Sequence, residues 1–128
     1  MDIVRGRAGA SEQRTANVTG TSWADPVLSS EHGVNISHVF FGPASRTYWH
    51  VHEYGQVLQV TSGNGWVVAR DGSGGRLAVG DTVFIPPGED HWHGADADSF
   101  LVHTSISLGG IEWRGEVTDE EYAAALRA

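Results

Sequence analysis

The chain has 128 residues, with seven histidines, eight arginines, no lysine and no cysteine, and its formal net charge is −8. This length suits one domain. The absence of cysteine excludes disulfides, thiolate metal sites and cysteine nucleophiles, and the absence of lysine excludes Schiff-base chemistry. An acidic chain without a basic run has no surface that follows phosphates, which argues against a nucleic-acid or anionic-membrane partner.

The N-terminal region carries no targeting or membrane pattern. No apolar run approaches the ~20 residues that span a bilayer, and no positive segment precedes an apolar stretch of secretory length. We therefore expect a cytoplasmic protein. Residues 1–15 are polar and unpatterned, so we expect a flexible arm or a contact with a partner subunit, and we place the folded domain at 16–128.

Short segments rich in Val, Ile, Thr, Phe and Trp recur along the chain between glycine- and proline-rich turn signals. They predict about eight strands, at 16–22, 34–41, 46–52, 56–61, 65–70, 76–78, 82–85 and 100–107. Because the turn signals are closely spaced, the pattern favours a β-sandwich or a barrel.

A helix is predicted only at the C-terminus. Thr118 and Glu121 have the spacing of a capping box, and the run EEYAAALRA continues as a helix. We expect this helix to cover one end of the barrel or to pack on a partner.

Two histidines share one face of the strand predicted at 46–52. Side chains alternate along a strand, so His50 and His52 project to the same side, together with Tyr48. Gln56 begins the next strand after a turn and can return beside the pair. A third imidazole, His91, follows the rigid Pro86-Pro87-Gly88 turn. Three imidazoles and an amide oxygen can surround a divalent ion.

The spacing of these residues resembles both motifs of the cupin superfamily. The matching positions are Gly42, His50, His52, Gln56 and Gly63 for the first motif, and Gly80, Asp81, Pro86, Pro87, Gly88 and His91 for the second. The runs RTYWHVHEYGQVLQVTSGNGW, PPGEDHWHGA, LVHTSI and VTDEEY resemble the small bacterial cupins that include manganese-dependent hydroxynitrile lyases. The similarity extends from Asn17 to Tyr122 and implies an all-β, jelly-roll-like cupin barrel (a double-stranded β-helix) with a short C-terminal helix.

The same resemblance implies that His50, His52, Gln56 and His91 hold one metal ion. Manganese is the expected metal, with iron, nickel or zinc as alternatives. Cupins usually carry Glu at the position of Gln56, and a neutral amide leaves the full charge of the metal in place, which makes it a stronger Lewis acid. The resemblance also implies a homodimer or homotetramer.

Three further residues are candidates for catalysis. His103 alternates with Ser105 and Ser107, so it is either an uncoordinated base or a buried histidine bonded to a backbone carbonyl. His93 could orient a ligand or a bound anion, but we expect the preceding turn to break strand alternation there, which favours a structural role. Tyr48 lends its hydroxyl to an oxyanion or fills the barrel.

The remaining pocket walls follow from strand alternation. Ser37, Val39 and Phe41 share one face of the strand at 34–41, and Leu58 and Val60 share the face of Gln56. Together with Ser105 and Ser107, they form a mainly apolar substrate pocket.

Three functions fit these residues. The first is a metal-dependent lyase that cleaves or forms small 2-hydroxynitriles, with His103 as the base. The second is a metal-dependent dioxygenase or other oxidoreductase acting on small phenolic or alkene substrates. The third is a non-catalytic cupin that binds a small molecule in a metal-dependent way.

Overall fold

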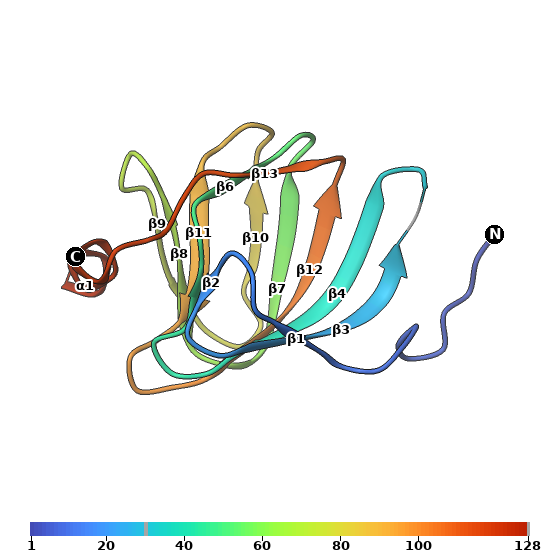
Figure 1. The fold of residues 1–128 in the computed structure, drawn as a ribbon, viewed down its shortest axis with the longest axis horizontal. Coiled ribbons are helices and arrows are strands. Elements are labelled where there is room, and N and C mark those ends of the chain that lie inside the picture. Colours follow the sequence, from blue (N-terminus) through green and yellow to red (C-terminus); the bar gives the residue numbers. More distant parts are fainter. Residues whose placement is uncertain (30, 128) are drawn as a thin grey trace.

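The computed structural model describes residues 1–29 and 31–127, and these form short antiparallel strands followed by one helix (Figure 1). The elements are β1 (Glu12–Arg14), β2 (Val18–Thr19), β3 (Ser22–Ser29), β4 (Val34–Phe41), β5 (Arg46–Thr47), β6 (His50–His52), β7 (Gln56–Gly63), β8 (Gly65–Ala69), β9 (Gly74–Leu77), β10 (Thr82–Ile85), β11 (His91–Ala95), β12 (Leu101–Leu108), β13 (Ile111–Trp113) and α1 (Asp119–Arg127).

The strands form two sheets that curl toward each other (Figure 1). One sheet has the order β1-β3-β4-β12-β7-β10. The other has the order β13-β6-β11-β5-β2, and β8 joins it beside β11 with β9 at its far edge. The predicted all-β barrel with a short C-terminal helix is therefore confirmed.

Several strand boundaries differ from the prediction. The strand predicted at 46–52 is broken into β5 and β6, because the chain leaves extended pairing at 48–49. The long β3 lies mostly beyond the predicted 16–22 segment, and a register irregularity between Pro26 and Leu28 interrupts its pairing with β4. Proline cannot donate to a ladder, so Pro26 hid this strand from a propensity-based prediction. The strands β11 and β13 were also not predicted.

An apolar core fills the space between the sheets beside the cavity described below. Its buried members are Phe41, Leu58, Val60, Val67, Leu77, Ile85, Ala95 and Leu101. The turn at Gly63 closes this core at one end: its φ is +78°, and a Cβ there would collide with the carbonyl oxygen of Phe100. Only glycine fits at this position.

The C-terminal helix packs on a second apolar cluster, formed by Trp49, Trp66, Trp92, Val117 and Tyr122. The predicted capping box is confirmed, since Thr118 N donates to Glu121 Oε1 and Glu121 N donates to Thr118 Oγ1, each at 3.0 Å. The helix ends at Arg127, and Ala128 lies outside the described residues. Within the part of the chain that is described, no helix is long and apolar enough to cross a bilayer.

Part of the segment predicted as an arm lies on the chain's own sheet. β1 pairs antiparallel with β3, with Arg14 opposite Ser22. Arg7 forms an ion pair with Asp25 at 3.2 Å, and Ala8 N donates to the Pro26 carbonyl. This pairing brings Arg14 to the rim of the barrel.

Candidate active site

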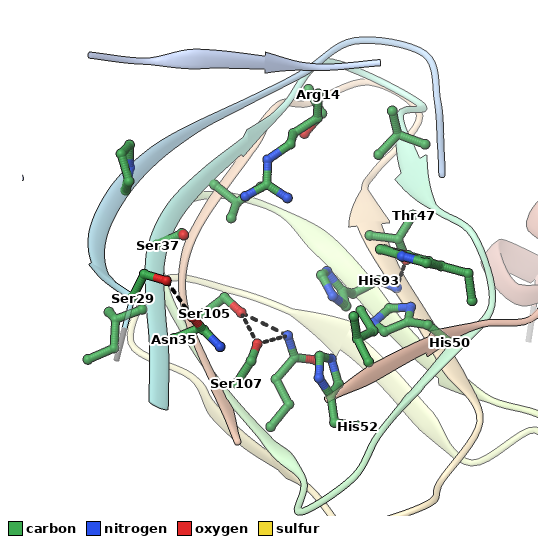
Figure 2. A pocket seen from close by; sticks show the side chains of 18 of the residues that line it. Arg14, Ser29, Asn35, Ser37, Thr47, His50, His52, His93, Ser105 and Ser107 are labelled. Carbon is green, nitrogen blue, oxygen red and sulfur yellow. Dashed lines mark hydrogen bonds between the residues drawn. The ribbon is translucent and has the colours of Figure 1, made fainter. Parts of the chain in front are cut away.

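A cavity of about 490 Å³ opens between the two sheets. Its walls combine aliphatic and aromatic side chains with serines and other polar residues, and histidines lie along one side of it (Figure 2). No aspartate or glutamate from the described ranges lines it. The cavity therefore combines an apolar body with a cluster of nitrogen ligands, which is typical of small-molecule sites.

His50 and His91 form the centre of the cluster. They lie opposite each other on the paired strands β6 and β11, and their ring centroids are 4.2 Å apart. Nδ1 of His50 donates to the Tyr48 carbonyl at 2.8 Å, and Nδ1 of His91 donates to the Glu89 carbonyl at 2.9 Å. Because a carbonyl only accepts, each Nδ1 carries the ring proton. Each neutral imidazole thus keeps its Nε2 lone pair for another partner.

Burial keeps these rings neutral. It is the main cause that lowers the pKa of His50 well below its ordinary value, followed by the nearby His91 ring. Burial also lowers the pKa of His91. Neutral imidazole is the form that binds a metal, so the site needs no proton release from these rings at neutral pH.

His52 is the member of the cluster without internal partners. Its side chain is 3% exposed, and neither ring nitrogen has a hydrogen-bond partner among residues 1–29 and 31–127. Its ring centroid lies 5.1 Å from that of His50 and 5.8 Å from that of His91. Burial lowers its pKa to about 4. A buried polar group without a partner is costly, and a bound ion would supply the missing partner.

Gln56 presents its amide oxygen to the same cluster. Its Nε2 donates to Ser105 Oγ at 2.8 Å and to Ser107 Oγ at 3.4 Å, which turns Oε1 toward Nε2 of His91, 3.0 Å away. Since Nδ1 of His91 holds the ring proton, both facing atoms are acceptors. Two acceptors at this distance repel each other unless a proton or a cation lies between them. The arrangement therefore fits a divalent cation.

His93 extends the cluster along β11. Strand alternation places it on the same face as His91, so the expectation that the preceding turn breaks this alternation is wrong: the turn ends before β11 begins at His91. One ligating nitrogen from each of His50, His91 and His93 lies within 4.8 Å of the others. Burial, followed by the nearby His103 ring, lowers the pKa of His93 well below its ordinary value.

Behind His93 lies His103, which is fully buried on β12. Its Nε2 is 3.0 Å from Nδ1 of His93, and its Nδ1 has no hydrogen-bond partner within the described chain. Burial lowers the pKa of His103 to about 4. His93 lines the cavity, whereas His103 does not. The two rings therefore form a pair in which only His93 faces the cavity.

The donor set fits a metal ion in two overlapping ways. The tightest trio of ligating atoms is that of His50, His91 and His93, but Nδ1 of His93 is already held by His103. The residues expected from the sequence add His52 and Gln56, which supply free nitrogens and an oriented oxygen. All of these ligands are neutral nitrogen or oxygen donors of the kind that first-row divalent ions accept.

The predicted pocket residues separate into two groups. Ser37, Val39, Phe41, Ser105 and Ser107 line the cavity. Leu58 and Val60 instead lie in the apolar core, 0% and 4% exposed. Tyr48 is also absent from the lining, because the chain leaves the strand between β5 and β6 and the neighbouring Thr47 takes the inward position.

Several residues that line the cavity were not predicted as pocket residues from the sequence. Ala16, Val18 and Ser22 come from the predicted strand at 16–22, and the others, from the arm and from strands that were not predicted, include Arg14, Pro26, Leu28, Ile111 and Trp113. The Trp113 ring lies 5.0 Å from that of His50, because β13 pairs with β6. Alternation of small and apolar residues at Ser22, Ala24 and Pro26 was the one available signal.

The fold and the histidine cluster together define a class of protein. The chain matches the family model described as a cupin domain over residues 37–106, which is more than half of its length. It belongs to the cupin family, as its motifs indicated.

Individual relatives narrow this assignment. The chain is 38% identical over 129 aligned residues to an (R)-mandelonitrile lyase from Granulicella tundricola, covering 95% of this chain and 98% of that protein. It is also 38% identical to a cupin-like protein from Thermotoga maritima, with a TM-score of 0.85 and 97% of each chain covered. A polyketide cyclase from Streptomyces resistomycificus shares the fold, with a TM-score of 0.72 at 16% identity over 98% of this chain and 94% of that one.

Proposed function

We propose that this protein is a metal-dependent lyase that cleaves small 2-hydroxynitriles or, in the reverse direction, forms them. The observation that carries the proposal is the cluster of buried, neutral histidines, of which His50, His52 and His93 line a cavity with partly apolar walls. The identity to a mandelonitrile lyase, which extends over nearly the whole chain, supports it.

We propose His50, His52, Gln56 and His91 as ligands of one divalent ion. Manganese is the first choice, with iron, nickel or zinc as alternatives. The unpartnered nitrogens of His52 and the oriented oxygen of Gln56 support this set over one that includes His93. When bound, such an ion supplies Lewis-acid stabilisation of negative charge on a substrate oxygen. Because no ligand is a carboxylate, the protein does not offset the charge of the ion.

Proton transfer is assigned to the His93–His103 pair. Nδ1 of His93 is engaged by His103, which leaves Nε2 of His93 to take the proton from the substrate hydroxyl. His103 then acts as a positioning residue that sets the His93 tautomer. The role of base, which the sequence analysis gave to His103 as one alternative, thus passes to His93. Tyr48 receives no role here, since it does not line the cavity.

The bond changes balance without another reactant. As the O–H proton moves to His93, the oxygen electrons form the carbonyl double bond, and the bond to the nitrile carbon breaks. Its electron pair leaves with cyanide, which recovers the proton from His93 as hydrogen cyanide. The remaining aldehyde lies against apolar walls that include Val39, Phe41 and Trp113.

We also propose a cytoplasmic location and a homodimer or homotetramer. A chain without cysteine does not depend on an oxidising compartment for its stability. Exposed Trp23, Ile111 and Trp113 offer apolar surface that a subunit contact would cover. Light scattering on purified protein measures the stoichiometry.

The function is tested with mandelonitrile as the probe and with metal analysis of the same samples. Wild type is expected to hold a metal ion and to release cyanide and benzaldehyde, whereas His50→Ala and His91→Ala lose both metal and activity. His38→Ala is the matched control, because His38 is an exposed histidine that does not line the cavity. Turnover that survives complete metal removal, or a metal-loaded wild type that releases no cyanide, contradicts the proposal.

A second pair of variants separates the two overlapping ligand sets. His52→Ala should lose metal. His93→Ala should keep metal but lose turnover, because we assign His93 to proton transfer rather than to ligation. The opposite pattern would assign His93 to the metal and remove it as the base.

A further inference from the structure

Arg14 reaches the cavity from a part of the chain far in sequence from the histidines. It ends β1, and the register of β1 against β3 places it opposite Ser22. Directly opposite residues of an antiparallel pair project from the same face. Ser22 is 1% exposed and lines the cavity, so Arg14 projects toward the cavity as well, with its side chain exposed at the rim. Figure 2 shows the Arg14 side chain extending into the pocket above His93.

Arg14 is the charged residue of this cavity. Every other lining residue from the described ranges is apolar or formally neutral at pH 7, although the whole chain carries a net charge of −8. Five of the other seven arginines are ion-paired with carboxylates in the structure: Arg7, Arg46, Arg70, Arg76 and Arg114. Within residues 1–29 and 31–127, Arg14 has no ion pair and no hydrogen-bonded side-chain partner. Arg14 is thus an exposed guanidinium without a carboxylate partner, and it lies at the rim of this cavity.

The surroundings of Arg14 indicate the shape of its partner. Ser22 Oγ is buried and has no hydrogen-bond partner in the described part of the chain, so a second polar group beside Arg14 is also unsatisfied. Apolar residues, among them Val18, Val39 and Phe41, line the same cavity as Arg14 and the histidines. A guanidinium presents two parallel N–H donors that match the two oxygens of a carboxylate.

We propose that Arg14 forms an anion-binding subsite, and that the preferred substrate of this cavity is a small molecule with an apolar body and a carboxylate at the end remote from the reacting carbon. The inference rests on the proposed function in taking this cavity as the substrate pocket. It deepens that function by naming the substrate class: an aldehyde acid or its 2-hydroxynitrile rather than an uncharged aldehyde.

Binding tests the subsite without reference to turnover. Benzoate and the uncharged benzamide are titrated by calorimetry into metal-loaded wild type, Arg14→Gln and Arg5→Gln. Wild type and Arg5→Gln are expected to bind benzoate more tightly than benzamide. In Arg14→Gln the ratio of the two affinities should fall about tenfold, while the affinity for benzamide stays unchanged. Arg5 is the control because it is an arginine of the same segment and is exposed like Arg14, but it does not line the cavity. Equal preference in Arg14→Gln and wild type overturns the proposal, as does a wild type that does not prefer benzoate.

Turnover distinguishes failure of this inference from failure of the proposed function. Cyanide release is compared between the 2-hydroxynitriles of 4-formylbenzoate and benzaldehyde. If wild type cleaves both, a kcat/KM ratio that favours the carboxylate and drops in Arg14→Gln supports the subsite, whereas an unchanged ratio overturns it alone. If neither is cleaved, the proposed lyase function is wrong, and the calorimetric comparison of benzoate with benzamide still tests whether Arg14 binds an anion. An unfolding curve of Arg14→Gln that matches wild type excludes a folding defect.

Discussion

Replacing Ser105 by alanine should weaken metal binding without touching a proposed ligand. Ser105 Oγ accepts the 2.8 Å hydrogen bond that holds the Gln56 amide, and the alternative acceptor, Ser107, lies at 3.4 Å. Loss of the shorter bond lets the amide rotate, so that Oε1 no longer points steadily at the cluster. Loss of one buried hydrogen bond of this kind costs about 1–2 kcal/mol. Metal affinity should therefore fall roughly 5- to 30-fold, which overlaps the range seen when outer partners of metal ligands are removed.

The assay is a competition titration of manganese against a chromophoric chelator. Ser37→Ala is the matched control, because Ser37 lines the same cavity but is not one of the serines that hold the Gln56 amide. Ser107→Ala should have a smaller effect than Ser105→Ala, in line with its longer contact. If Ser105→Ala binds manganese as tightly as Ser37→Ala does, the orientation of Gln56 does not depend on the serine pair, and the reasoning is refuted.

Three further outcomes follow from the fold. Gly63→Ala should lose roughly 2 kcal/mol or more of unfolding free energy in urea, whereas Gly72→Ala, which has a similar positive φ but open space around it, should lose less. Tyr122→Phe should lose about 1 kcal/mol of unfolding free energy, because the hydrogen bond from the Tyr122 hydroxyl to the Ala95 carbonyl is removed. Burial raises the pKa of Tyr122 to about 12, so an absorbance titration of this variant should also lack the tyrosine ionisation step at the highest pH. Protein in free manganese at a hundred times the Kd for the ion should be about 2.7 kcal/mol more stable than protein from which a chelator has removed manganese. Thermal unfolding that is the same with and without manganese would contradict a site built for an ion.

Much of the fold could be predicted because local chemistry and overall architecture agree. The capping box at Thr118 depends only on residues three apart, so the sequence contains all of its information. The strands β4, β7 and β12 are rich in branched and aromatic side chains and match their predicted segments closely. β3 was missed because Pro26 opposes local strand propensity, and its pairing with β4 overrides that preference.

The site was predictable where it follows strand alternation and motif spacing. His50 and His52 share a short strand, so their common face needed no tertiary information. The role of His93 depended on where β11 begins, and only the paired structure fixes that residue. Arg14 could not be found at all, because its place in the cavity arises from the pairing of β1 with β3 and leaves no local pattern.

The position of the ion itself tests the central claim most directly. Crystals of the manganese-loaded protein, measured with X-rays on either side of the manganese absorption edge, should show one anomalous peak in contact with His50, His52, Gln56 and His91. His93 should stay bonded to His103 in the same map. A peak that contacts His93 in place of His52 and Gln56, or the absence of any peak in the cavity, would contradict the account.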